Sequence, residues 1–102
     1  MRLVAAQSTS VVDQDTVIRF RQKGALVTGS YRGGRILAGY LIGKWHAGQL
    51  TFHYVQAADD ETIDKGRSTC RVERLPDGRL RLEEQFVWES REGSGTNIFE
   101  EI

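Results

Sequence analysis

Features that would mark several protein classes are scarce in this sequence. Cys70 is the only cysteine among 102 residues, so no internal disulfide can form and a disulfide-stapled secreted scaffold is excluded. Fourteen basic and fourteen acidic residues cancel, and Lys and Arg form no continuous run. The charge balance therefore favours neither nucleic acid nor a membrane surface as a partner.

Long apolar segments are also absent. The start, MRLVAAQSTS, contains one Arg and only four consecutive apolar residues. That is too few for the apolar region of a signal peptide, and no stretch is long enough to span a bilayer. We therefore expect a cytoplasmic protein. The length suits one hydrophobic core, so residues 1–102 are predicted to form a single domain.

No segment has an extended helical periodicity, whereas strand signals recur between turn residues. The turns are QKG (22–24), RGG (32–34), HAG (46–48) and PDG (76–78). This regular spacing predicts an all-β protein, an antiparallel up-and-down meander of about eight strands that closes into a small lipocalin-like barrel. A partly open, rolled sheet is the alternative. The predicted strands are residues 2–7, 15–21, 25–31, 35–45, 49–56, 65–75, 79–91 and 95–101.

A three-residue hairpin loop that ends in Gly fixes which residues face each other. At PDG this rule pairs Glu73 with Arg81 and Arg71 with Glu83, two opposite charge pairs on one face. Applied to all four turns, it gives partners of equal parity, so even-numbered residues face the interior from the second strand to the seventh. The predicted interior includes Ile18, Phe20, Leu26, Thr28, Ser30, Tyr40, Ile42, Phe52, Tyr54, Ser68, Cys70, Leu82, Glu84 and Phe86.

Glu84 interrupts the apolar stripe formed by Leu82, Phe86 and Trp88. A buried polar group without a partner costs about 1–3 kcal/mol, so Glu84 must bond to other polar groups, to water or to a ligand. We predict a small-ligand site at the polar end of the barrel, entered between loops 8–14, 32–34, 57–65 and 91–93. Its ligand-binding residues are predicted to be Tyr40, Tyr54, Ser68, Glu84, Trp88 and Glu100, and its mouth to be ringed by Tyr31, Arg32, Arg35 and Arg91.

The last strand is expected to bring a second acid toward Glu84. Even parity places Glu100 inside, whereas a shift of one residue places Phe99 and Glu101 inside. Glu84 then has three interpretations: a bond to a buried hydroxyl such as Tyr40 or Tyr54 or to an inward-reaching Arg, a contact with a ligand, or half of a carboxylate pair in a small enzyme. The non-catalytic interpretations are favoured, because the sequence indicates neither a substrate nor a water between the acids.

Other reactive residues point to no chemistry. Cys70 is predicted to lie opposite Glu84, which would raise the pKa of the thiol and make it inert. His46 and His53 lie apart from it and have no metal-ligand spacing. No catalytic residue, metal site or cofactor is predicted.

Odd-numbered residues of the third to fifth strands suggest a second kind of function. Val27, Leu37, Leu41 and Trp45 would form an apolar patch on the outside of the barrel, and such patches usually mark a contact surface. A homodimer through this patch is one explanation, and coverage by the N-terminal segment is the other. The alternative to a ligand-binding barrel is therefore a structural or protein-interaction module.

Nearly the whole chain from Thr16 onward resembles a family of short bacterial proteins that often carry the name N-acetylglutamate synthase. The shared motifs are Tyr31-x-Gly33-Gly34, Leu75-Pro76-Asp77-Gly78-Arg79, Glu84-x-x-x-Trp88 and Glu100-Glu101, with Phe86 where the family often has Trp. The resemblance implies no established chemistry. Residues 21–26 are the nearest match to an acetyl-CoA pyrophosphate loop, but they end in Leu26 and lie in a predicted hairpin.

Overall fold

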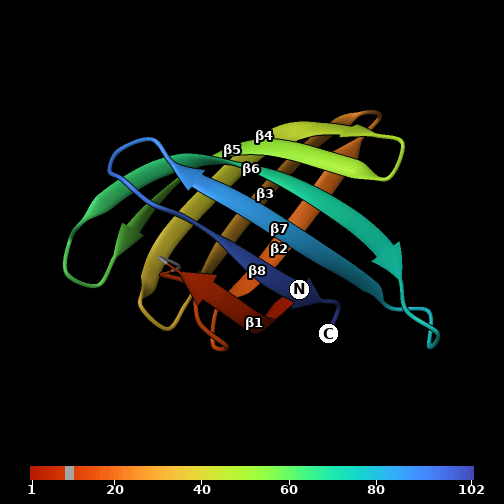
Figure 1. Cartoon of the computed structure of the whole chain (residues 1–102), viewed down its shortest axis with the longest axis horizontal. Helices are drawn as coiled ribbons and strands as arrows, with labels where there is room; N and C mark the ends of the chain where they lie inside the picture. The colour runs from red at the N-terminus through yellow and green to blue at the C-terminus, as the bar shows by residue number, and fades with distance from the viewer. Residues whose placement is uncertain (9–10) are drawn as a thin grey trace.

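The computed structural model, which describes residues 1–8 and 11–102, is an antiparallel β-barrel. Each strand pairs with the next in the sequence, and the last pairs with the first (Figure 1). The predicted all-β meander is confirmed, and the barrel is closed rather than partly open. The strands are β1 (Arg2–Ser8), β2 (Val17–Lys23), β3 (Leu26–Gly33), β4 (Ile36–His46), β5 (Gln49–Ala58), β6 (Ile63–Arg74), β7 (Leu80–Trp88) and β8 (Ser94–Glu100).

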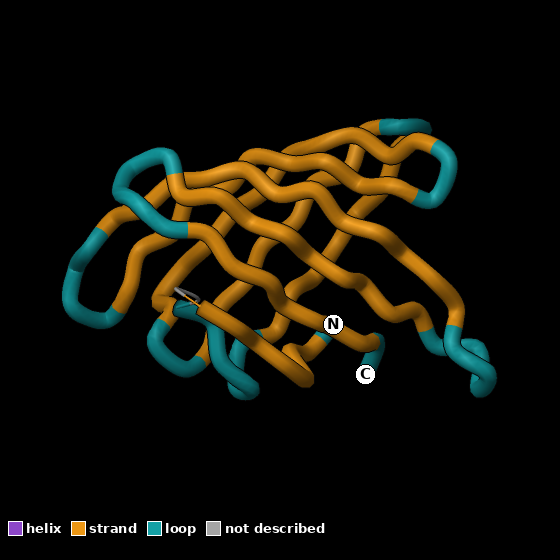
Figure 2. The backbone as a smooth tube through the Cα atoms, viewed as in Figure 1, coloured by secondary structure: helices purple, strands orange, loops and turns teal. Residues whose placement is uncertain are grey.

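The connections divide between the two ends of the barrel (Figure 2). The turns after β2, β4 and β6 lie at one end, together with both chain termini. The connections after β1, β3, β5 and β7 lie at the other end, where the sequence predicts the mouth. The predicted loop 8–14 includes residues 9–10, which lie outside the described residues.

The register of β6 and β7 is the one that the PDG turn predicts. The amide of Leu75 donates to the carbonyl of Arg79 at 2.7 Å, and Glu73 pairs with Arg81 along the strands. The neighbouring pair, Arg71 and Glu83, forms an ion pair at 3.1 Å. Even-numbered residues of β5, β6 and β7 accordingly face the interior.

The predicted parity is wrong on β3 and on β4 beyond Ile36, because the hairpin loops before β3 and after β4 have two residues rather than three. The loop between β3 and β4 also has two residues, with Gly33 opposite Ile36, but a bulge between Tyr31 and Gly33 restores equal parity there. Lys23 pairs with Leu26 across Gly24 and Ala25, and His46 pairs with Gln49 across Ala47 and Gly48. The first loop has a positive φ of 61° at Gly24, and the second has positive φ at both positions, 50° and 81°, as two-residue hairpin turns require. Each shorter loop exchanges the two faces of the next strand, so the second exchange restores even parity on β5.

Odd-numbered residues of β3, and of β4 after the register shift between Ile36 and Ala38, therefore fill the barrel. Ile36 itself is buried, as the even parity predicts. Val27, Tyr31 and Leu41 are buried, whereas Tyr40 and Ile42 are 61% and 55% exposed. The inward glycines of β4 permit close packing, because a Cβ on Gly39 would collide with the ring of Tyr31, and one on Gly43 with the carbonyl of Thr51 and the Cα and Cβ of Phe52. These glycines serve core packing rather than contact with another molecule.

The apolar outer patch that the sequence predicts does not exist in that form. Val27 and Leu41 lie inside the barrel, Trp45 is half-buried, and only Leu37 is exposed. The prediction that these four residues form an outer surface for a homodimer is therefore wrong. The large apolar side chains that are exposed are Val4, Leu26, Leu37, Tyr40, Ile42, Val55, Ile63, Val87 and Ile102.

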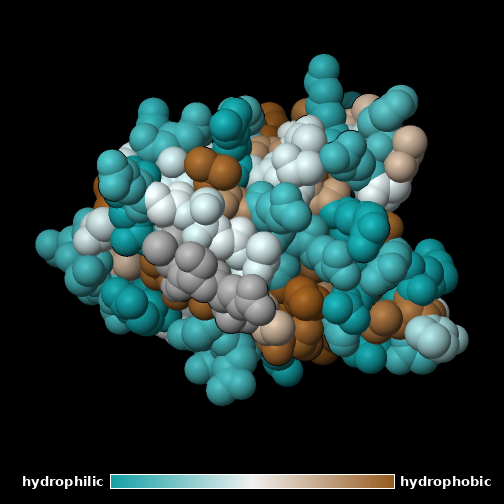
Figure 3. All heavy atoms as spheres, viewed as in Figure 1, coloured by the Kyte–Doolittle hydropathy of each residue, from teal (hydrophilic) through white to brown (hydrophobic). Residues whose placement is uncertain are grey.

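The barrel closes through one long and one short seam. β1 pairs with β8 from Arg2, opposite Glu100, to Ser8, opposite Gly95. Between β1 and β2 the register contains Arg2 opposite Val17, supported by two hydrogen bonds between Met1 and Ile18 at 2.6 and 2.8 Å. The side of the molecule over β1, β7 and β8 presents mainly hydrophilic side chains (Figure 3). In the described part of the chain, no helix has the length and hydropathy needed to cross a bilayer.

Candidate ligand-binding site

A cavity of about 30 Å³ lies inside the barrel, enough for one or two water molecules. Apolar side chains form most of its wall, and five polar ones reach it from β3, β5, β7 and β8. The cavity is lined by Val11, Val12, Ile18, Tyr31, Leu41, Phe52, Tyr54, Gln56, Glu84, Phe86, Trp88, Asn97 and Phe99.

Glu84 lies at the centre of the polar groups and is buried. Across the strands it stands between Cys70 on β6 and Asn97 on β8. Ser68 Oγ donates to Glu84 Oε2 at 2.5 Å, and Asn97 Nδ2 donates to Oε1 at 2.9 Å. Burial raises the pKa of the carboxyl group, and the two hydrogen bonds offset only part of that rise.

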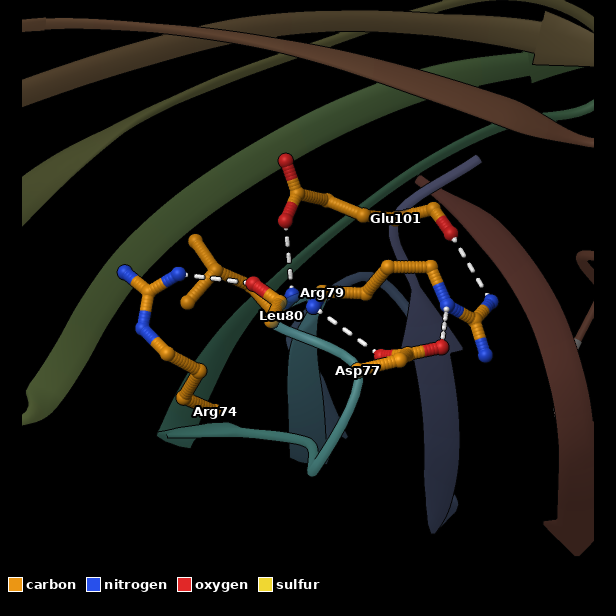
Figure 4. Close-up of polar contacts among 6 residues, drawn as sticks. Arg74, Asp77, Arg79, Leu80 and Glu101 are labelled. Atoms are coloured by element: carbon orange, nitrogen blue, oxygen red, sulfur yellow. Dashed lines mark hydrogen bonds and ion pairs between the residues drawn. The ribbon is translucent and has the colours of Figure 1, made fainter.

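The expected partners of Glu84 are wrong. Tyr40 points outward, because the short turn after β2 exchanges the faces of β3 and β4. On β8 the inward residues are Asn97 and Phe99, so Glu100 lies on the outer side. Glu101 is exposed, and its Oε1 accepts a hydrogen bond from the amide of Leu80 at 2.6 Å (Figure 4).

These positions remove the basis for a carboxylate pair. Neither Glu100 nor Glu101 reaches the cavity, and the groups on the Glu84 carboxyl are a hydroxyl and an amide. Within the described residues, no second carboxylate lines the cavity. The geometry therefore does not bring either of the two expected acids to Glu84.

Two tyrosines flank Glu84 and differ in their hydrogen bonding. Tyr31 donates its hydroxyl to Gln56 Oε1 at 2.8 Å. The hydroxyl of Tyr54 is buried and has no hydrogen-bond partner among the described residues. Burial, followed by the nearby charge of Glu84, raises the pKa of both phenols. Both therefore stay protonated at neutral pH. Tyr31 already uses its proton in the bond to Gln56, so of the two hydroxyls Tyr54 is the one able to donate to a ligand.

Aromatic rings form the wall beside Tyr54. The rings of Tyr54 and Trp88 meet edge to face at 5.7 Å, and those of Phe86 and Trp88 at 5.4 Å. Above Trp88, the guanidinium of Arg91 lies 4.3 Å from the ring centre and 3.5 Å from the Asp64 carboxylate. This arrangement gives an aromatic wall of steeply inclined rings, with the guanidinium of Arg91 over the ring of Trp88.

The other residues predicted at the mouth lie elsewhere. Tyr31 is inside the cavity rather than at its rim. Arg35 is exposed and lies 3.7 Å from Asp59, while Arg32 lies on the outer face of β3. Arg91 is the one predicted mouth arginine that contacts a cavity-lining side chain in the described structure.

Cys70 lies where the sequence places it, opposite Glu84 and fully buried. Burial, and to a smaller extent the charge of Glu84, raises the pKa of its thiol. The thiol is therefore neutral and unreactive.

Sequence reasoning missed Asn97, which lines the cavity, and Asp64, a buried residue beside the site that pairs with Arg91. In the segment TNIFEE, one face of the strand carries Asn97 and Phe99, and the other carries Ile98 and Glu100. Each face combines one apolar and one polar residue, so the pattern alone does not predict which face points inward. The larger ring of Phe99 was the available signal for the inward face. Asp64 is buried and accepts a hydrogen bond from Ser90 at 2.8 Å, which its position in the predicted loop 57–65 did not suggest.

Closed eight-stranded barrels have an interior just wide enough to be filled by side chains or to hold one small ligand, as in lipocalins and streptavidin. The barrel and its enclosed polar groups define a small β-barrel of the ligand-binding type. The family model described as avidin-like protein matches residues 1–102, and the chain belongs to the avidin-like family. No curated protein and no solved structure gives a significant match. The family gives no support to an N-acetylglutamate synthase activity.

Proposed function

We propose that this protein binds one small ligand inside the barrel, with a polar group of the ligand beside Tyr54 and Glu84. The observation that carries the proposal is the Tyr54 hydroxyl, which is buried and has no hydrogen-bond partner among the described residues, on a side chain that lines the cavity. An unsatisfied buried hydroxyl costs about 1–3 kcal/mol. A ligand atom that bonds to this hydroxyl removes that cost.

The surrounding chemistry favours an uncharged head group. The raised pKa of Glu84 favours a neutral carboxyl, and a second carboxylate beside it would be repelled if Glu84 ionised. Tyr54 and Glu84 together present both donors and acceptors. A lactam, amide or cyclic urea matches this set, with an apolar body against Phe86 and Trp88.

The size of the cavity sets a condition on binding. About 30 Å³ holds water but is far below the roughly 300–1,000 Å³ of sites for drug-sized ligands. Val11 and Val12, which precede β2, are half-buried and line the cavity. A larger ligand therefore has to displace these two side chains.

The test combines native mass spectrometry of freshly purified protein with titration of two probes. The probes are 2-imidazolidinone, a minimal cyclic urea, and biotin, a larger cyclic urea with an apolar chain that streptavidin binds. We expect a retained ligand or saturable binding of at least one probe. The absence of both would overturn the proposal, because the interior would then be only a packed core.

Two tyrosine variants provide a matched comparison. Tyr54→Phe removes a hydroxyl with no protein partner, so we expect weaker ligand binding by about tenfold with unchanged or higher stability. Tyr31→Phe breaks the bond to Gln56 and should lower the free energy of unfolding by about 1–2 kcal/mol. Equal effects of the two variants on binding would show that Tyr54 has no special contact with the ligand.

An interaction module is the second candidate function, favoured by the exposed side chains of Tyr40, Ile42 and Val55. The expected homodimer stays a proposal, but Val27 and Leu41 of the patch predicted for it lie inside the barrel. Dimerisation would have to use other residues.

A further inference from the structure

Although the net charge is zero, acidic and basic residues are distributed unevenly along the chain. The segment from Val17 to Ala58 contains six Lys or Arg residues and no Asp or Glu. This segment forms β2, β3, β4 and β5, four neighbouring strands of the barrel. All fourteen acidic residues therefore lie in the rest of the molecule.

The fold gathers these cations on the outside of one wall. Arg19 and Arg21 lie on β2, Arg32 on β3 and Lys44 on β4, and all four are exposed. None of the four forms an ion pair with a described residue, in contrast to Arg71, which pairs with Glu83 at 3.1 Å. We call the outward residues of β2–β5 the basic face.

Apolar side chains occupy the centre of the basic face. Tyr40 lies directly between Ser30 of β3 and Val55 of β5. Tyr40, Ile42 and Val55 are 61%, 55% and 45% exposed. Beside Tyr40, a surface groove of about 620 Å³ is bordered by Arg19 and Arg32, with Asp15, which precedes β2, as the one acidic residue among the described residues that border it. An exposed aromatic centre among unpaired arginines is the composition of a protein interface, where Tyr and Arg dominate the binding energy.

The charge pattern argues against a second copy as the occupant. In a two-fold dimer the same patch meets itself. Every charged residue of the basic face is a cation, so self-pairing would bring like charges together across the interface.

Two other polyanionic partners fit less well. Nucleic acid is bound through cations and through stacking of bases on aromatic rings. The aliphatic side chains of Ile42 and Val55 contribute little to such binding. A bilayer is engaged by side chains that reach into its interfacial region, whereas Tyr40, Ile42 and Val55 lie along the strands of the barrel wall. A protein with carboxylates around an apolar anchor satisfies both the cations and the apolar centre.

We infer that the basic face docks an acidic segment of another protein, with an aromatic or aliphatic side chain of that segment against Tyr40, Ile42 and Val55. The inference is independent of the proposed ligand site, because these residues point away from the cavity. Variants of the basic face should therefore leave ligand binding in the barrel unchanged.

The test uses a short fluorescent peptide in which Glu alternates with Trp and Leu, and measures binding by anisotropy. Two companion peptides replace Glu by Gln, or Trp and Leu by Ser. We expect only the first peptide to bind well, with affinity that falls as salt is raised from about 20 mM to about 300 mM, since exposed charges are screened over that range.

Protein variants locate the binding surface. Arg19→Gln with Arg32→Gln should weaken binding roughly tenfold, and so should Tyr40→Ser. The matched control is Arg71→Gln with Arg74→Gln, which removes the same charge from β6 and should leave binding unchanged. All these side chains are exposed, and circular dichroism melts check that each variant is folded.

Several outcomes would overturn the inference. Equal losses in both double variants, or no loss in Tyr40→Ser, would show general charge attraction without a defined site. Tighter binding to a single-stranded oligonucleotide or to phosphatidylserine vesicles would assign the face to those partners. A dimer of the wild-type protein that Tyr40→Ser dissociates would assign the face to a second copy.

Discussion

Glu84 combines complete enclosure with hydrogen bonds that suit either protonation state. Ser68 and Asn97 each reach one carboxyl oxygen, and the Ser68 hydroxyl can reverse its role and accept from a protonated carboxyl. Burial nevertheless raises the pKa above the ordinary value of 4.5. The folded chain therefore holds this proton more tightly than the unfolded chain does. The resulting contribution to stability is complete below pH 4.5 and is lost as the pH rises through the folded pKa.

Replacing Glu84 by Gln tests this account. Gln keeps an acceptor for Asn97 and a donor for Ser68 but cannot ionise. We expect Glu84→Gln to equal the wild type in free energy of unfolding at low pH and to equal or exceed it near pH 7. Urea denaturation across this pH range measures the difference, with the partly exposed neighbour Glu83→Gln as control. A loss of about 3–5 kcal/mol at pH 7 would mean that the carboxylate is ionised and paired.

Strand β4 shows how one loop residue decides which side chains build the core. Its neighbours Leu41 and Ile42 are both aliphatic, yet Leu41 is 5% exposed and lines the cavity, whereas Ile42 is 55% exposed. The hairpin turns at Gly24 and Gly48 fix this choice. A third residue in either turn would exchange the two faces of the strand.

Placing Glu at each of these two positions tests the assignment of faces. Leu41→Glu puts a charge into the apolar wall of the cavity and should lower the free energy of unfolding by about 3 kcal/mol or more. Ile42→Glu stays in water and should change it by only about 0.5 kcal/mol. Chemical denaturation of the two variants measures both values. The reverse order would mean that the even face of β4 is the inner one.

The extent of pairing between neighbouring strands varies around the barrel. β5, β6 and β7 pair along most of their lengths, and the turn after β6 is anchored to the C-terminal residues by Arg79, which donates to the carbonyl of Glu101 at 3.2 Å (Figure 4). The seam between β1 and β2 depends on Arg2 opposite Val17 and on the two bonds of Met1. Sparse pairing lowers the free energy of local opening.

Native-state hydrogen exchange should reveal this difference. We expect peptides that cover β1 and the start of β2 to exchange well before those that cover β5, β6 and β7, with mass spectrometry as the readout. The long ladder between β3 and β4 is the internal comparison. Equal protection of the β1–β2 seam and of β6 would show that the barrel opens only as one unit.

The sequence by itself determined what depends on local pattern. Period-two alternation and frequent Gly gave the strands of the meander, the PDG turn gave the β6–β7 register, and Glu84 was correctly placed inside opposite Cys70. Local signals suffice there because neighbouring residues in the chain are also neighbours in the hairpin.

Only the tertiary structure decided two features: which faces of β3 and β4 point inward, and which residue of β8 meets Glu84. The first depends on one residue of loop length, and the second on closure of the barrel. QKGA and HAGQ suit loops of two or three residues equally well, so the faces of β3 and β4 were fixed by which side chains could fill the interior around Tyr31 and Phe52. Asn97 reached Glu84 because β8 had to meet β7 and β1 at once, a constraint absent from its own sequence. The acid-free stretch from Val17 to Ala58 can be read from the chain, but its cations share one face because four consecutive strands form one wall.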